Sequence, residues 1–131
     1  MVSETDITGY RYEDAGHNAS HNYLLPALFR ILDSLSPREK RLFELGCGNG
    51  SVAQAMTERG WKVTGVDPSR EGIEQARKAR PHLNLYQRSA YDDLAGQYGQ
   101  FPVVVSLEVV EHVYAPRDYA RTLYNLLERG G

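Results

Sequence analysis

A run of alternating glycines and a later acidic residue have the types and spacing needed to hold a nucleoside. The run covers residues 46–50, with glycine at the first, third and fifth positions, and Asp67 follows 21 positions after Gly46. Glycine allows positive φ angles and lets the backbone approach a ligand closely. A carboxylate at the end of the next strand can accept hydrogen bonds from both ribose hydroxyls. Together these residues predict a site for a nucleoside cofactor.

Each of these features also has a purely structural explanation. A glycine loop after a strand can be a simple turn, and Asp67 can be the N-cap of a helix that starts with Pro68. Cys47 is interpreted as a small residue in a tight loop, because no neighbouring base would activate its thiol. Taken alone, the glycine loop and Asp67 therefore leave the structural explanation open beside the cofactor site.

A second group of chemically capable residues follows the most apolar segment. If residues 108–112 are helical, Glu108, Glu111 and His112 lie on one face, at i, i+3 and i+4. Such a group can hold a divalent cation, although histidine is not a preferred ligand of Mg²⁺. Glu111 or His112 can instead take a proton from a hydroxyl group, and a helix-stabilising role is the third interpretation.

The elements that must position these residues are strands alternating with helices. Hydrophobic spacing predicts strands at 41–45, 62–66, 83–87 and 101–107, with helices from about 22, at 51–59, at 69–80 and after 116. A short helical turn is expected near Leu94, and the first helix should start near Asn22, since Pro26 is tolerated only in its first turns. The run Val103–Val105 predicts a strand buried on both faces. This order indicates an α/β, Rossmann-like, doubly wound parallel sheet of about four strands.

The chain divides into an N-terminal arm and a core. Residues 1–19 are interpreted as an arm or lid, and residues 20–131 as the core. Tyr10 and Tyr12 are candidates to cover the cofactor, and the alternative for each is ordinary aromatic packing of the arm against the core. A helix closed by Gly130-Gly131 is normally followed by another strand in an alternating fold, so we expect a sheet that lacks its last strands. The open edge beside residues 101–107 would then favour a homodimer.

Composition excludes several other classes of protein. The 131 residues fit one domain, and a net charge of −2 gives no basic excess for binding nucleic acid. The single cysteine cannot form an internal disulfide, which favours a reducing, cytoplasmic location. No apolar run reaches the roughly 18 residues needed to span a bilayer, so no membrane association is expected.

The spacing Glu44-x-Gly46-x-Gly48-x-Gly50 resembles the first motif of the class I S-adenosylmethionine-dependent methyltransferases. The resemblance extends from about residue 41 to 131 and implies a domain of seven strands, of which about the last three would be absent. It implies S-adenosylmethionine as cofactor and an unidentified methyl acceptor. The cofactor-binding residues that it implies, with the two lid tyrosines, are Glu44, Gly46, Cys47, Gly48, Gly50, Asp67, Pro68, Ser89, Ala90, Tyr91, Ser106, Leu107, Glu108, Tyr10 and Tyr12.

The segment after the last predicted strand bears on the acceptor and on a metal. Glu-x-x-Glu-His at 108–112 is similar to the Mg²⁺-binding segment of ubiquinone-pathway O-methyltransferases, which implies Mg²⁺ at Glu108, Glu111 and His112. Base-methylating enzymes often carry an Asn/Asp-Pro-Pro-aromatic motif where this chain has residues 106–109, so an oxygen or small-molecule acceptor is favoured. A nicotinamide-dependent dehydrogenase is disfavoured because Ser51 replaces the third glycine of its fingerprint. A non-catalytic cofactor-binding or interaction module stays open.

Overall fold

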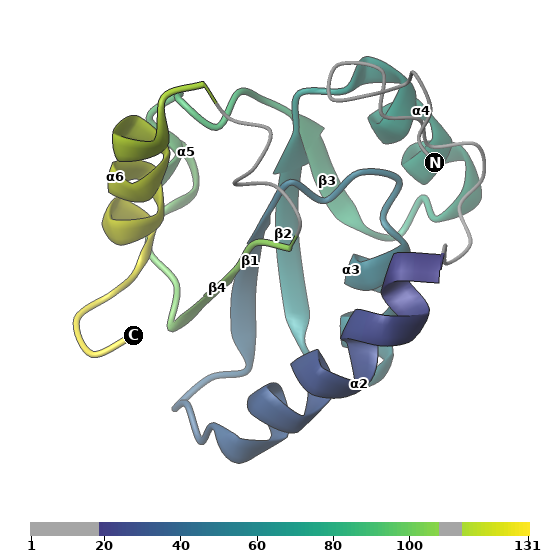
Figure 1. Ribbon diagram of the computed structural model, residues 1–131, viewed down its shortest axis with the longest axis horizontal. Helices are drawn as coiled ribbons and strands as arrows, with labels where there is room; N and C mark the ends of the chain where they lie inside the picture. The colour runs from purple at the N-terminus through teal and green to yellow at the C-terminus, as the bar shows by residue number, and fades with distance from the viewer. Residues whose placement is uncertain (1–18, 108–113) are drawn as a thin grey trace.

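The computed structural model of the chain describes residues 19–107 and 114–131. Strands and helices alternate along these residues, as the sequence predicts (Figure 1). The elements are α2 (Ala19–Ser34), β1 (Arg41–Leu45), α3 (Ser51–Glu58), β2 (Lys62–Asp67), α4 (Arg70–Ala79), β3 (Asn84–Gln87), α5 (Leu94–Tyr98), β4 (Val103–Val105) and α6 (Pro116–Leu126).

The four strands form one parallel sheet in the order β3-β2-β1-β4. The chain moves outward from β1 to β2 and β3, then returns to place β4 on the other side of β1. The direction of the strand order therefore reverses between β1 and β4. In open parallel sheets, ligands bind outside the carboxyl ends of the strands at such a reversal. The predicted α/β, Rossmann-like, parallel architecture is confirmed.

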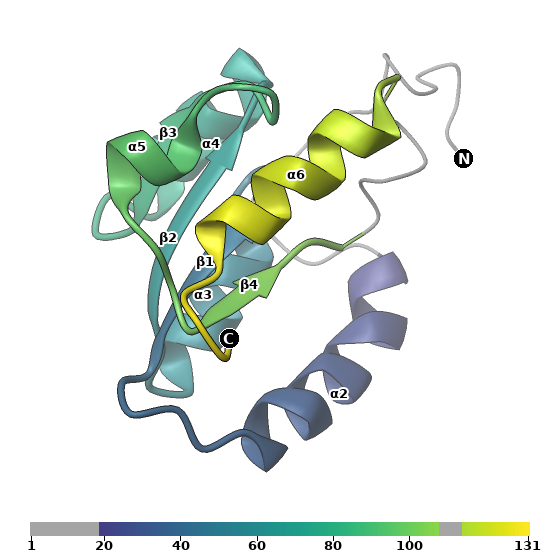
Figure 2. The ribbon, with the colours of Figure 1, turned by 90° about the vertical axis from the view of Figure 1, so that its left-hand side faces the viewer.

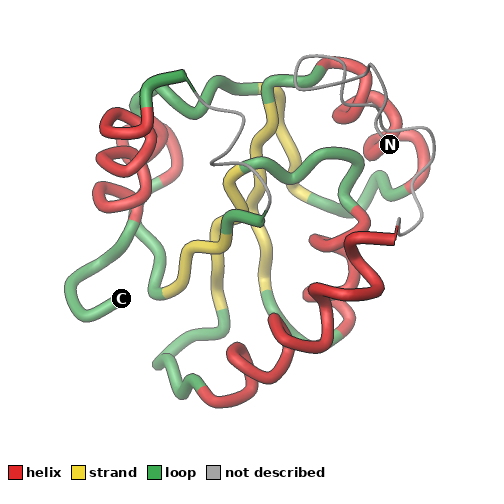
Figure 3. The backbone as a smooth tube through the Cα atoms, in the orientation of Figure 1, coloured by secondary structure: helices red, strands yellow, loops and turns green. Residues whose placement is uncertain are grey.

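Helices cover both faces of the sheet (Figures 2 and 3). Successive side chains of a strand point to opposite faces, so Leu42 and Phe43 of β1 enter different cores. Leu42 packs in the core shared by α2, α3 and α4, and Phe43 packs in the core shared by α5 and α6. Within the described residues, no helix has the length and apolar character required to cross a bilayer.

The first helix differs from its prediction. It begins at Ala19 rather than near Asn22, and Pro26 consequently lies inside it. Proline removes one backbone hydrogen bond from a helix interior. Three buried leucines, Leu25, Leu28 and Leu32, lie on one side of α2 and pack into the core. We attribute the tolerance of Pro26 to this packing, since tertiary contacts supply most of the stability of a protein helix.

The last strand is shorter and more exposed than predicted. The expected strand at 101–107 is reduced to Val103–Val105, of which only Val105 is fully buried. Val103 and Val104 are half-buried because β4 has a strand partner on only one side among the described residues. Phe101 instead forms a single parallel bridge with Leu127. The prediction of a strand buried on both faces is therefore wrong.

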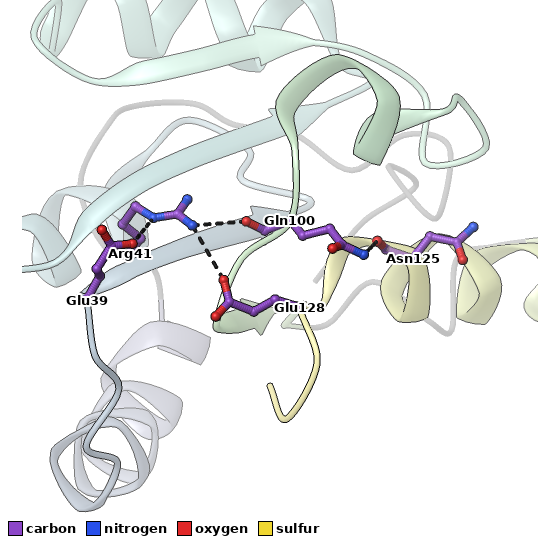
Figure 4. A network of polar contacts seen from close by, with 5 residues as sticks. All are labelled: Glu39, Arg41, Gln100, Asn125 and Glu128. Atoms are coloured by element: carbon purple, nitrogen blue, oxygen red, sulfur yellow. Dashed lines mark hydrogen bonds and ion pairs between the residues drawn. The ribbon is translucent and has the colours of Figure 1, made fainter.

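A polar network at the amino end of the sheet joins β1 to the segment after α6 (Figure 4). The Arg41 guanidinium donates to Glu39 Oε1 at 2.9 Å and to the Gln100 carbonyl at 3.0 Å, and its Nη2 lies 3.6 Å from Glu128 Oε2. Gln100 Nε2 in turn donates to the Asn125 carbonyl at 3.2 Å. Exposed ion pairs of this kind contribute little to stability. The network lies at the opposite end of β1 from the glycine loop, so it belongs to the fold rather than to the site.

Candidate functional site

The glycine loop at 46–50 connects β1 to α3 at the carboxyl end of the sheet. Its three glycines have φ angles of 90°, 54° and 87°, in the left-handed region that side chains disfavour. The backbone N–H groups of Gly46 and Cys47 both donate to the Val66 carbonyl of β2, at 2.8 and 2.9 Å. A Cβ atom at Gly50 would lie 2.8 Å from Leu85 Cδ1. Glycine is therefore needed here for both backbone conformation and space.

Asp67 connects this loop to the start of the next helix. Its carboxylate, only 5% exposed, accepts hydrogen bonds from Gly48 N at 2.9 Å and Ser69 N at 2.8 Å. The N-cap of α4 is Ser69, whose hydroxyl accepts from Gly72 N at 3.0 Å. The alternative interpretation of Asp67 as a helix N-cap is thus wrong. Burial raises the pKa of Asp67, and the two backbone hydrogen bonds oppose this shift.

Glu44 is a buried acid beside Asp67. Its side chain is 2% exposed. Burial, and to a smaller extent the negative charge of Asp67, raises the pKa of Glu44 from 4.5 to about 8. Its Oε1 atom has no hydrogen-bond partner among the residues that the structure describes. A buried polar atom without a partner is costly and calls for an explanation, such as a ligand that supplies the missing contact.

Cys47 fits the structural role predicted for it. The side chain is buried, and a Cβ atom placed on Gly65 of β2 would lie 2.9 Å from Cys47 Cβ. Burial, together with the charges of Glu44 and Asp67, raises the pKa of the Cys47 thiol well above its usual value. The thiol is therefore neutral, and a neutral thiol is a poor nucleophile.

The loops after β2 and β3 also lie at the carboxyl end of the sheet. Pro68 is exposed directly after Asp67. Ser89, Ala90 and Tyr91 are half-buried, and the Ser89 hydroxyl accepts from Tyr91 N at 3.0 Å. The Tyr91 ring lies 4.9 Å from that of Tyr114. Contacts between this loop and a nucleoside base stay a prediction.

Ser106 and Leu107 follow β4 on the other side of the glycine loop. The Ser106 hydroxyl is hydrogen-bonded to the Leu45 carbonyl at 3.0 Å and to the Tyr119 hydroxyl. Leu107 is half-buried and packs against the core below α2 and α3. The glycine loop, Asp67 and Ser106 thus all lie at the carboxyl end of the sheet.

Sequence reasoning missed two polar groups of α6. The sequence predicts a helix after residue 116 but assigns no site role to Tyr119 or Thr122. Thr122 Oγ1 donates to the Ala90 carbonyl at 2.7 Å. Both residues carry hydroxyls on the buried side of an amphipathic helix, and that position was the available signal.

Several predicted residues lie outside the described part of the chain. They are the lid tyrosines and the acceptor-side group: Tyr10, Tyr12, Glu108, Glu111 and His112. Their roles in covering the cofactor, in catalysis and in metal binding stay predictions. Within residues 19–107 and 114–131, no group of three or more histidine, cysteine or acidic side chains is placed to hold a metal ion.

Comparisons with known proteins agree with this geometry. The chain is 37% identical over 94 residues to the ubiquinone biosynthesis O-methyltransferase of Roseobacter denitrificans, and 40% identical over 95 residues to that of Caulobacter sp. strain K31. Each alignment covers 70% of this chain and 38% of the relative. The chain thus spans well under half the length of the curated relatives that it matches.

Solved structures share the fold. A Pyrococcus horikoshii protein has a TM-score of 0.69 at 21% identity, over 86% of this chain and 50% of its own. The plantazolicin methyltransferase BamL has a TM-score of 0.69 at 22% identity, over 84% of this chain and 43% of its own. The family model described as a methyltransferase domain matches residues 17–131, which include the glycine loop, both buried acids and all the described helices and strands. The chain therefore belongs to the methyltransferase domain family.

Proposed function

We propose that this chain binds S-adenosylmethionine in its glycine loop and forms the cofactor-binding part of a methyltransferase. The observation that carries the proposal is the hydrogen bond that joins the glycine loop to Asp67 at the end of β2. This loop follows β1, one of the two strands between which the strand order reverses. The acceptor that we propose is an oxygen atom of a small molecule. Support for oxygen comes from the relatives named as O-methyltransferases, of which this chain spans 38%.

The residues at this edge fit the chemistry of that cofactor. Each oxygen of Asp67 accepts one backbone N–H and keeps lone-pair capacity for a ribose hydroxyl. Glu44 Oε1 has no hydrogen-bond partner among the described residues. It suits a cationic group, because a positive charge favours the ionised form of a carboxyl. Gly46, Gly48 and Gly50 carry no side chains, so a ligand could approach the loop backbone closely at these three positions.

The chain's own contribution to methyl transfer would be orientation and exclusion of water. S-adenosylmethionine supplies a methyl group that its sulfonium makes electrophilic. Glu111 or His112 would accept the proton of a hydroxyl acceptor, a role supported by sequence position alone. The same holds for Mg²⁺ at Glu108, Glu111 and His112, where an ion would lower the pKa of the acceptor oxygen. The free thiol of Cys47 supports the cytoplasm as the compartment.

Isothermal titration calorimetry of the 131-residue chain tests the proposal. We expect S-adenosylmethionine and S-adenosylhomocysteine to bind with one-to-one stoichiometry and NAD⁺ to give no heat beyond dilution. Binding of NAD⁺ alone would overturn the cofactor assignment in favour of a dehydrogenase. Binding of S-adenosylmethionine without turnover in a longer protein that contains this domain would support the non-catalytic module.

A further inference from the structure

The side chain of Ser106 lies at the point where β1 and β4 separate. The two strands pair from Leu42 with Val103 to Glu44 with Val105, so the next pair in register would be Leu45 with Ser106. There the Ser106 hydroxyl, 3.0 Å from the Leu45 carbonyl, takes the place of a backbone contact. The glycine loop begins at the following residue, so this hydrogen bond fixes the chain just before the loop.

Tyr119 of α6 makes a second hydrogen bond to that hydroxyl. A carbonyl oxygen can only accept, so Ser106 must donate its one hydroxyl proton to Leu45. The hydrogen bond between Ser106 and Tyr119 is then donated by the tyrosine. Tyr119 is 2% exposed, and its burial raises the pKa of its phenol, which keeps the donating proton in place. Tyr119 of α6 therefore donates to Ser106, which follows β4, and Ser106 donates to Leu45 of β1.

The helix that carries Tyr119 is itself fixed to the sheet. Tyr119 and Leu126 are buried in the core that contains Phe43 and Leu45 of β1. Thr122, one helical turn after Tyr119, donates to the Ala90 carbonyl in the loop after β3. The position of the Tyr119 hydroxyl is thus set by packing rather than by its hydrogen bond to Ser106.

We propose that Tyr119 is a positioning residue of the cofactor site, acting through Ser106 on the carbonyl that precedes the glycine loop. This inference rests on the proposed function, because it concerns affinity for S-adenosylmethionine. Without the phenol hydroxyl, the Ser106 hydroxyl loses one partner and is free to rotate away from Leu45. The loop would then be held less firmly in the conformation that binds the cofactor.

The test is a double-mutant cycle on the dissociation constant for S-adenosylhomocysteine, measured by calorimetry well below the melting temperature of each variant. A typical hydrogen bond contributes a net 0.5–1.5 kcal/mol, so we expect Tyr119→Phe to weaken binding about 2- to 12-fold. Ser106→Val should weaken binding at least as much, and Tyr119→Phe should have no further effect in that background. Threonine keeps the hydroxyl, and valine has the same shape as threonine without it. The Ser106→Thr variant should therefore bind S-adenosylhomocysteine more tightly than the Ser106→Val variant.

Tyr98→Phe is the matched control. Tyr98 packs 5.8 Å from the Phe43 ring in the same core, and its hydroxyl has no partner within the described residues. We expect its removal to leave the affinity unchanged. The inference would be overturned if Tyr119→Phe kept the parental affinity, or if it weakened binding equally with and without the Ser106 hydroxyl. Either result would leave the proposed function standing. Absence of S-adenosylhomocysteine binding by the parent chain would overturn the proposed function as well.

Discussion

Replacing the buried acid Glu44 by glutamine should change how the stability of this domain depends on pH. The folded state raises the pKa of Glu44 from 4.5 to about 8, so the folded chain binds a proton that the unfolded chain has lost. This stabilising contribution is complete below pH 4.5 and is lost as the pH rises through 8. Stability of the parent should therefore fall across this window, whereas glutamine has no proton to lose.

The size of the effect follows from the shift. One pKa unit corresponds to 1.36 kcal/mol, which gives at most about 5 kcal/mol between pH 4.5 and 8 and a limiting slope of about 1.4 kcal/mol per pH unit. Small domains are stable by about 5–15 kcal/mol, so even half of this change is measurable. Between pH 5 and 8, Glu44→Gln should gain stability relative to the parent as the pH rises.

Urea denaturation of the parent and Glu44→Gln at several pH values between 5 and 8.5 measures this difference. Glu71→Gln is the control, because Glu71 is an exposed glutamate of α4. Parallel curves for the parent and Glu44→Gln would refute the conclusion that Glu44 is protonated in the folded protein at neutral pH.

Asp67→Ala removes a charged hydrogen-bond acceptor worth about 1.5–3 kcal/mol, so S-adenosylhomocysteine should bind about 10- to 150-fold more weakly by calorimetry, whereas Asp33→Ala on distant α2 should bind as the parent does. Gly50→Ala should destabilise the chain in urea by more than the roughly 1–2 kcal/mol of a left-handed alanine, because its Cβ would also lie 2.8 Å from a leucine side chain. Gly60 has a similar φ of 96°, but a Cβ there would meet only the flexible end of a lysine at 3.4 Å. Equal losses in Gly50→Ala and Gly60→Ala would contradict this. Among the described residues, β4 has a strand partner on one side only, and this edge should promote self-association. A stable monomer by light scattering at high concentration would count against it. If residues 108–112 bind Mg²⁺, complete chelation of divalent ions should reduce the turnover of a longer, active protein that contains this domain. Full turnover after chelation would refute the predicted metal site.

Sequence patterns predicted the elements well where local signals and tertiary packing agree. The helix after the glycine loop and the helix from residue 70 have an N-terminal signal, an apolar face and a terminating residue, and both were located to within a residue or two. Pro26 misled the prediction of α2 because local propensity favours a helix start near proline, whereas three buried leucines extend the helix on both sides of it. The valines of β4 misled the burial prediction because hydrophobicity does not reveal whether a strand lies at an edge.

The candidate site could be predicted only in part. Asp67 was identified from its separation from the glycines along the sequence. Its hydrogen bonds to Gly48 and Ser69 depend on how two adjacent strands end, which that separation does not encode. The raised pKa of Glu44 arises from burial and from Asp67, neither of which can be seen in its spacing. The contact of Tyr119 with Ser106 joins two elements whose register no local pattern encodes.

Amide chemical shifts measured during a titration with S-adenosylhomocysteine test the central claim most directly. The account predicts that the largest shifts in a ¹H–¹⁵N spectrum fall on Gly46, Gly48 and Gly50 and on Ser69 beside Asp67, with small shifts along the outer turns of α2. These amides would lie next to the ligand or next to the carboxylate that holds it. A saturating titration that leaves the glycine loop unshifted and moves amides elsewhere would show that the chain binds its ligand at another place.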